Sequence, residues 1–192
     1  MSKQKQKRRK RRENQNRYKT FWRRFWAGMA DGMVLMPLTL LSQVLWDHSE
    51  QIPNVILALY YIILAFSGYV YRILLHGFYG KTIGKMLFKL VVVDVSEKSP
   101  LKMSQAFRRD MIPLFLGSFY IIIKFFHILE TGDPLSPAVR PLGAAYWIIS
   151  SSSAIWFWGE FITMLTNRKR RALHDFVAGS VVVHIPNDSA GK

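Results

Sequence analysis

Two acidic side chains lie inside long apolar stretches of this chain. Asp31 is the only charged residue of the 25–46 stretch, and Glu160 is the only one of the 142–165 stretch. A carboxylate inside hydrocarbon costs roughly 2.5–3.5 kcal/mol even on insertion scales, so it normally faces other protein or water. Because burial raises the pKa of a carboxyl toward the working pH, an acid in such a place can exchange a proton for a cation. Both acids are therefore candidate transport residues.

Arg24 adds a basic group on the helix face that carries Asp31. The two residues are seven positions apart, which is about two helical turns. Gly28 and Gly32 form a G-x-x-x-G pair on this helix, which allows another helix to approach closely. Glu160 and Asp31 are expected at a similar depth, roughly 8–9 Å from their helix ends. At that depth the acids either share a proton or a cation, or pair with basic residues at the inner surface, and the sequence leaves both open.

Four apolar stretches are long enough to carry such residues across a bilayer. At about 1.5 Å per residue, a helix of about 20 residues covers the roughly 30 Å hydrocarbon core. The predicted membrane spans are residues 25–46, 53–75, 111–129 and 142–165. The predicted fold class is an all-α membrane protein with four transmembrane helices.

The basic residues indicate how these spans are oriented. The formal net charge is +15, and 12 of the 27 Lys and Arg residues lie within the first 24 positions. The 76–109 connector and residues 167–171 are also basic, whereas the charged residues of the 47–53 and 130–141 connectors are mainly acidic. By the positive-inside rule, both termini are predicted to be cytoplasmic. The predicted location is the plasma membrane, with the protein spanning a bacterial inner membrane several times.

Both chain ends are predicted to be tails outside the membrane domain. Residues 1–22 have low complexity and no apolar periodicity, which predicts a disordered basic cytoplasmic tail. Its partners are expected to be the lipid bilayer and its anionic head groups. Nucleic acid is the less favoured partner. Residues 185–192 form the C-terminal tail, which leaves residues 23–184 as the transmembrane domain.

The cytoplasmic connectors contain further elements. Residues 81–90 place apolar side chains on one side and lysines on the other, which predicts an amphipathic segment in the membrane interface. The valine-rich runs 91–93 and 179–183 are strand candidates. Because an isolated strand has no partner for its backbone, these runs are expected to pair as a two-stranded β-ribbon.

Several kinds of chemistry find no support in the sequence. The chain contains no cysteine, which excludes disulfides and thiolate nucleophiles. Its five histidines are scattered, and no nucleophile–base pair, metal-ligand spacing or cofactor loop is present. The sequence therefore predicts no enzyme activity, no catalytic residue, no metal site and no cofactor.

Three stretches taken together resemble the RDD family of membrane proteins. They are RRFWAGMADGMVL, KTIGKMLFKLVVVD and RRALHDFVAGSVVV, and with their spacing they cover about residues 21–184. They resemble the family blocks R-R-x-x-A-x-x-x-D, T-x-G-K and L-H-D-x-x-A-G-T-x-V-V, with Ser180 where threonine is usual.

The resemblance assigns the residues that give the family its name. The family arginine falls on Arg24, with Arg23 as the adjacent candidate, and the two aspartates fall on Asp31 and Asp175. Some members of the family have been associated with cation/proton antiport, so the resemblance implies transport as one possible function.

The first hypothesis is a small cation/proton exchanger. In it Asp31 is the exchange site, Glu160 is a second acid and Arg24 tunes or gates the site. Four spans enclose little volume and no internal repeat is evident in the sequence, so this hypothesis requires a homo-oligomer or a partner membrane protein.

The second hypothesis is a membrane scaffold or accessory subunit that transports nothing. In it Arg24, Asp31, Asp175 and His174 form a structural charge cluster at the inner surface. This cluster would dock the C-terminal segment against the first helix, because partly buried ion pairs can specify such an arrangement.

Overall fold

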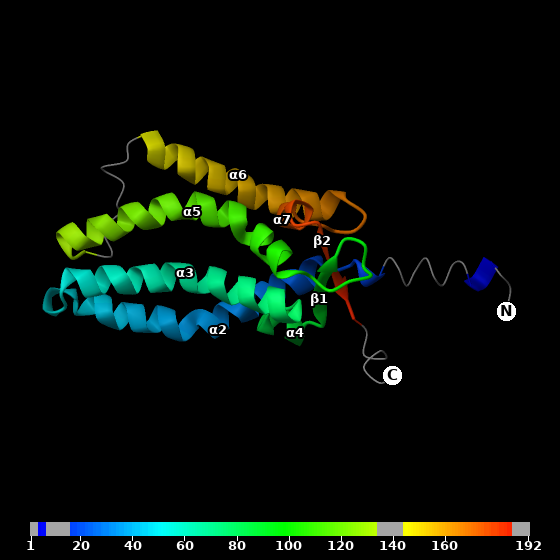
Figure 1. Ribbon diagram of the computed structural model, residues 1–192, viewed down its shortest axis with the longest axis horizontal. Coiled ribbons are helices and arrows are strands. Elements are labelled where there is room, and N and C mark those ends of the chain that lie inside the picture. Colours follow the sequence, from blue (N-terminus) through cyan, green and yellow to red (C-terminus); the bar gives the residue numbers. More distant parts are fainter. Residues whose placement is uncertain (1–3, 7–15, 134–143, 186–192) are drawn as a thin grey trace.

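The computed structural model describes residues 4–6, 16–133 and 144–185. Four long helices lie side by side (Figure 1). They are α2 Phe21–Asp47, α3 Asn54–Tyr79, α5 Met103–Thr131 and α6 Ala144–Thr166. A short 3-10 helix, η1 Ser49–Gln51, joins α2 to α3. The remaining elements are the short helices α4 Ile83–Leu87 and α7 Leu173–Val177 and the strands β1 Leu90–Asp94 and β2 Ser180–His184.

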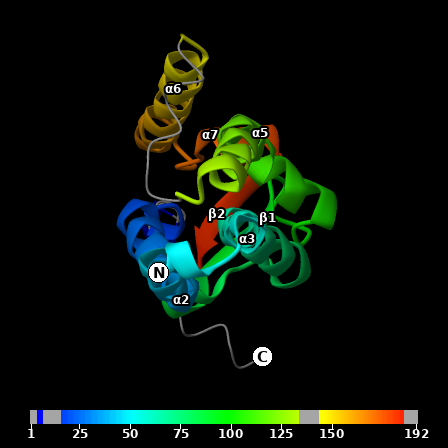
Figure 2. The same cartoon turned by 90° about the vertical axis from the view of Figure 1, so that its left-hand side faces the viewer.

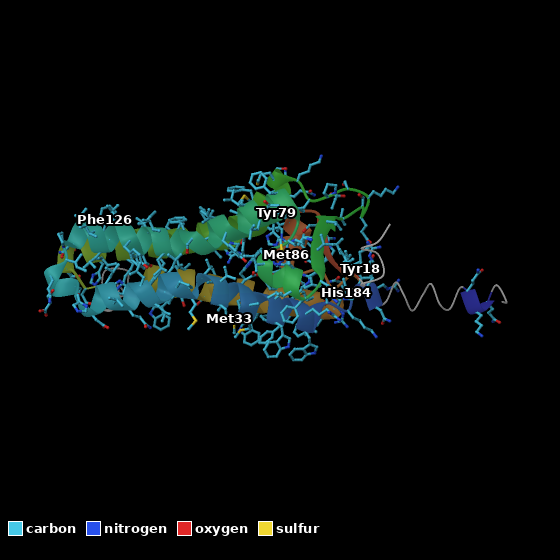
Figure 3. The ribbon with its side chains drawn as sticks, turned by 90° about the horizontal axis from the view of Figure 1, so that it is seen from below. Tyr18, Met33, Tyr79, Met86, Phe126 and His184 are labelled. Atoms are coloured by element: carbon cyan, nitrogen blue, oxygen red, sulfur yellow. The ribbon has the colours of Figure 1, made fainter. Side chains whose placement is uncertain are left out.

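The long helices have the properties of membrane spans. Three helices of the described chain, α2, α3 and α5, are long and apolar enough to cross a membrane. Large apolar side chains project from the outside of the bundle, as Met33 and Phe126 do in Figure 3, where they are 68% and 56% exposed. Such a surface is suited to lipid rather than water. The span predicted at 142–165 matches α6 closely, but α6 is not among these three helices, so the fourth span stays a prediction.

Helix α5 extends beyond the third predicted membrane span. That span covers residues 111–129, whereas α5 runs from Met103 to Thr131. Arg109 and Asp110, which precede the predicted span, are only 5% and 7% exposed, and both have charged partners inside the bundle. These charged residues are therefore part of the helix.

The two strands form a β-ribbon at one end of the bundle, which we call the ribbon end. β1 and β2 pair antiparallel, and Val92 opposite Val182 is the central pair. Both valines are fully buried, in a cluster with Ala27, Leu90 and Ala106. The amphipathic segment predicted over 81–90 is shorter in the structure, because only Ile83–Leu87 is helical before the chain enters β1.

The chain before α2 also packs against the ribbon end. The hydroxyl of Tyr18 donates a hydrogen bond of 2.5 Å to the carboxylate of Glu97, and Thr20 is fully buried. Tyr18 and Thr20, which lie within the basic tail predicted over residues 1–22, thus contact the ribbon end.

The two halves of the chain repeat one order of elements, which the sequence did not reveal. Residues 21–94 and 103–184 each contain two long helices, a five-residue helix and a five-residue strand. Thr82 and Ala172, which precede the two short helices, have nearly the same backbone angles, φ −83 and ψ 169 against φ −82 and ψ 169. Lys89 and Gly179, which precede the two strands, both have a positive φ. Parallel repeats of this kind occur in several transporter folds.

The glycine pair in α2 does not bring helices of this chain together. A Cβ atom added at Gly28 or at Gly32 would meet nothing within 4 Å. The close approach expected from G-x-x-x-G is therefore absent within the described part of the chain.

Candidate functional site

Asp31 receives hydrogen bonds from the segment that enters α4. Its carboxylate accepts bonds of 2.7 Å from the hydroxyl of Tyr71, the hydroxyl of Thr82 and the backbone N–H of Gly84. Thr82 also caps α4, because its side-chain oxygen accepts a hydrogen bond from the N–H of Lys85. Within the described residues Asp31 forms no ion pair, and Arg24, which lies on the same helix face, pairs with Asp175 instead. Asp31 instead fixes the start of α4 on α2.

Gly84 is required for this contact. A Cβ atom at position 84 would overlap the carbonyl oxygen of Ala27 and lie 2.8 Å from a carboxylate oxygen of Asp31. A side chain here would force α4 away from α2. The threonine and glycine of the T-x-G-K block therefore have a shared structural role.

Asp175 is the centre of a second polar contact. Its side chain is fully buried and accepts from Arg24 at 2.6 Å and from Arg109 at 3.0 Å. It also accepts from the N–H of Ala172 and the hydroxyl of Ser180. Burial by itself raises the pKa of this carboxyl, but the Arg24 and Arg109 guanidiniums hold it well below its usual range. Asp175 is therefore a buried carboxylate anion.

His174 joins this centre to Glu160. The Nδ1 atom of His174 lies 2.5 Å from one carboxylate oxygen of Glu160, and the N–H of His174 donates to the other at 3.1 Å. The Nε2 atom of His174 lies 3.5 Å from Asp175. Four of the five predicted site residues thus form one network, and only Asp31 lies outside it. The residues of this network are Arg24, Asp175, His174 and Glu160.

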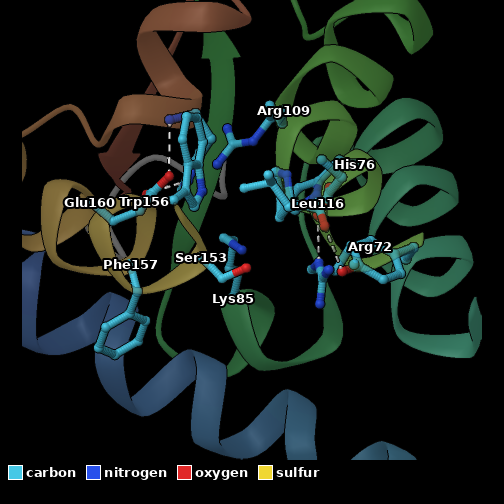
Figure 4. A pocket seen from close by; sticks show the side chains of 14 residues that line it. Arg72, His76, Lys85, Arg109, Leu116, Ser153, Trp156, Phe157 and Glu160 are labelled. Atoms are coloured by element: carbon cyan, nitrogen blue, oxygen red, sulfur yellow. Dashed lines mark hydrogen bonds and ion pairs between the residues drawn. The ribbon is translucent and has the colours of Figure 1, made fainter. Parts of the chain in front are cut away.

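The network borders two cavities at the ribbon end. The inner cavity has a volume of 440 Å³ and lies among α3, α5 and α6 (Figure 4). The side cavity has a volume of 470 Å³ and is lined by residues of α2 and α6. Both cavities are lined by Arg72, Lys85, Arg109, Phe157, Glu160 and His174. Asp31 lines the side cavity, so it shares that space with Glu160 although the two acids do not touch.

Comparison with protein-family models shows how this chain is related to known proteins. The model of the RDD family matches residues 18–179. The chain belongs to the RDD family. No curated protein and no solved structure matches it. The match begins at Tyr18, whose hydroxyl donates a hydrogen bond to Glu97.

The RDD residues of this protein lie together at the ribbon end, but they do not form a triad. Arg24 binds Asp175, whereas Asp31 binds backbone and hydroxyl donors. The closing L-H-D-x-x-A-G block supplies His174 and Asp175, which connect α6, α2 and α5. In this RDD protein the family motifs therefore hold α4 and α7 against the long helices.

Several cavity residues were not singled out from the sequence. Arg109 was one of several bases in the 76–109 connector, but the structure buries it beside Asp175. Arg72 pairs with Asp110 at 2.7 Å. His76 was one of five scattered histidines, and the structure leaves it 2% exposed with neither ring nitrogen partnered within the described residues. Arg109 and His76 have no sequence signal that separates them from their neighbours, whereas Arg72 is the only charged residue of the 53–75 stretch.

Lys85 is a strongly perturbed base that lines both cavities. Burial and the nearby Arg109 guanidinium together lower the pKa of its ammonium group to about 7, although the Asp31 carboxylate opposes both. Within the described residues its ammonium group has no hydrogen-bond or ion-pair partner. The RDD T-x-G-K block thus supplies a lysine that can gain or lose a proton near neutral pH.

Proposed function

We propose that this RDD protein is a small proton-coupled transporter that takes its solute into the inner cavity. The observation that carries the proposal is a 440 Å³ cavity lined by ionisable groups from five different elements. Protein interiors are normally close-packed, and buried charged groups are normally in contact with each other. A protein that only had to hold its helices together would not need such a cavity. This cavity is lined by ionisable side chains that include those of Arg72, Lys85, Glu160 and His174.

The cavity supports proton coupling because it contains groups that can hold a proton. The pKa of Lys85 is about 7, so its charge changes within the working range of a cell. Glu160 and His174 form a close acid–imidazole pair on its wall. A proton can move between such groups when a solute enters or leaves the cavity.

Asp31 is less well suited to be the cation exchange site. Both of its oxygens already accept short hydrogen bonds, and one donor is the backbone N–H of Gly84. A cation at Asp31 would have to displace donors that fix α4. We therefore propose that Asp31, Arg24 and Asp175 position the cavity and do not exchange ions themselves.

The internal repeat supports a transport function as well. Transporters built from two repeats alternate their access by moving one repeat against the other around a site between them. Here the inner cavity is lined by α3 and α4 of the first half and by α5, α6 and α7 of the second half. The cavity lies within one chain, so an oligomer is not needed to form it.

We also propose the membrane arrangement that the charges predict. The ribbon end faces the cytoplasm, α6 is the fourth span, and the basic residues before α2 contact anionic head groups of the plasma membrane. The support is the basic composition of the segments at the ribbon end, which include residues 81–89 and 167–171.

A scaffold without transport is the second candidate. The observation that favours it is the completeness of the Asp175 contacts, where two arginines, a serine and a backbone N–H occupy the carboxylate. Buried ion networks of this kind specify an arrangement of elements without needing a cavity.

The transporter and the scaffold can be distinguished by a proton-transport assay in liposomes that contain a trapped pH indicator. Purified wild-type protein, Lys85→Gln and Lys81→Gln are reconstituted and exposed to gradients of sodium, potassium, phosphate or sulfate. Transport predicts a pH change with one of these solutes in the wild type and in Lys81→Gln, and its loss in Lys85→Gln. Lys81 is the matched control because it lies four positions away and lines neither cavity. Folded wild-type protein that moves no protons with any solute would favour the scaffold.

A further inference from the structure

The carboxylates around the two cavities are already occupied by donors. Asp110 accepts from Arg72 at 2.7 Å, and Glu160 accepts from both the ring and the N–H of His174. Asp31 accepts three hydrogen bonds from Tyr71, Thr82 and Gly84. A cation that entered the cavities would therefore find no free carboxylate among these acids.

The unsatisfied groups around the same space include donors. Buried side-chain atoms without a hydrogen-bond partner, among the described residues near the cavities, are Nη2 of Arg24 and both ring nitrogens of His76. His76 is 2% exposed and lines the inner cavity, and Arg24 lines the side cavity. An arginine nitrogen can only donate, and an imidazole always has at least one N–H. A buried donor without an acceptor raises the free energy of the folded state. A bound group with acceptor atoms would therefore be stabilised here.

Two further bases add positive charge at this point. Among the described residues, Arg109 uses one guanidinium nitrogen, Nη1, for Asp175 and Ser180, and Lys85 has no partner for its ammonium group. Figure 4 shows Arg109, His76 and Lys85 around the same open space. The inner cavity thus offers donors and positive charge from α3, α4 and α5 together.

We propose that the inner cavity binds a small oxyanion, with Lys85, His76 and Arg109 as its donors. A phosphate or carboxylate group has several acceptor oxygens and a negative charge, and both properties match these three side chains. Water alone would satisfy single donors but would leave the ammonium charge of Lys85 uncompensated. The inference names the solute class of the proposed transporter and rests on that proposal for its transport role, whereas the binding can be tested without it.

The anion has two possible sources with the same chemistry. It is either a free oxyanion or the head group of an anionic lipid. The side cavity adjoins the inner cavity and is lined by Phe21, Phe25 and Phe161, against which an acyl chain can lie. The experiment therefore has one arm for each source.

The first arm measures binding of inorganic phosphate by calorimetry. The full chain is purified in a maltoside detergent, which carries no phosphate, and is titrated at constant ionic strength with chloride as the balancing anion. We expect saturable binding that Lys85→Gln weakens about tenfold or more and His76→Phe also weakens, because each change removes a donor. Lys85→Arg keeps the charge and should retain binding. Lys81→Gln should stay within about twofold of the wild type. Size-exclusion profiles confirm that each variant is folded.

The second arm tests the lipid head group. Protein in the same detergent is incubated with phosphatidylglycerol, and retained lipid is counted by native mass spectrometry. Phosphatidylglycerol that is retained by the wild type, lost in Lys85→Gln and competitive with inorganic phosphate identifies the lipid as the source. Phosphate binding without lipid retention identifies a free oxyanion.

The possible results test the oxyanion site and the proposed transport function separately. Folded wild-type protein that binds neither phosphate nor phosphatidylglycerol would overturn the oxyanion site, as would binding that Lys85→Gln leaves unchanged. Oxyanion binding without any proton movement in liposomes would overturn the transporter and keep the site. Proton transport driven only by sodium or potassium would keep the transporter and remove the oxyanion as its solute.

Discussion

The guanidinium of Arg24 and the carboxylate of Asp175 meet at 2.6 Å although 151 positions separate them in the chain. Arg109 approaches the same carboxylate from α5 at 3.0 Å. One buried acid thus ties the first helix, the third long helix and the C-terminal segment together at the ribbon end. The cavities lie beside this point, so their shape depends on it.

Asp175→Asn is expected to destabilise the protein strongly. The change leaves Arg24 and Arg109 buried without a counter-charge, and breaking a buried pair in this way costs about 3–5 kcal/mol. Unfolding by SDS titration in mixed micelles measures the free energy. Asp47→Asn is the control, because Asp47 is an exposed acid at the end of α2. If both variants unfold at the wild-type SDS concentration, Asp175 does not hold the ribbon end together.

The sequence predicted the spans far better than the partners of their charges. Apolar runs placed α2, α3 and most of α5, because hydrocarbon selects long apolar helices irrespective of their neighbours. Helical periodicity put Arg24 and Asp31 on one face, but a shared face does not say which other element packs there. The short segments at the ribbon end fill the space between the helices. As a result, Arg24 forms an ion pair with Asp175, and Asp31 accepts a hydrogen bond from α4.

The cavity was not predictable for a related reason. Lys85 and Arg109 both belong to a basic connector whose residues look alike in sequence. Both line the inner cavity because β1 pairs with β2, which places α4 and α7 between the ends of the long helices. Contacts between residues so distant in sequence leave no local pattern.

Gly84→Ala is expected to loosen α4 from α2. The new methyl group would overlap the carbonyl oxygen of Ala27, and overpacking of this kind costs about 1–3 kcal/mol. Gly28→Ala is the matched control on the opposite side of the contact, since nothing lies within 4 Å of its added Cβ. That control should be neutral or slightly stabilising, because alanine favours helix. Equal unfolding free energies for the two variants would contradict the observed contact.

Asp31→Asn separates a structural role from an exchange role. An amide nitrogen would face one of the donors from Tyr71, Thr82 or Gly84, and a buried group left unsatisfied costs about 1–3 kcal/mol. We expect lower stability, with phosphate binding retained in the fraction that remains folded. The double variant with Thr82→Ala should lose less than the sum of the two single variants, because the two residues share one hydrogen bond. Wild-type stability with complete loss of proton transport would instead make Asp31 an exchange site.

Lys85 should give the protein a stability that depends on pH near neutrality and above. Burial lowers its pKa to about 7 in the folded state, whereas a lysine in the unfolded chain titrates near 10.4. Between these values the unfolded state holds more protons, so the stability of the wild type rises with pH across this window. Lys85→Gln removes the group and should give a flatter profile between about pH 6 and pH 10, while Lys81→Gln should follow the wild type. Unfolding midpoints over this range provide the test.

Saturating inorganic phosphate should flatten the wild-type profile of stability against pH as well, because a bound oxyanion favours the charged ammonium group. If wild type and Lys85→Gln keep parallel profiles with and without phosphate, Lys85 is neither buried in its neutral form nor part of an anion site.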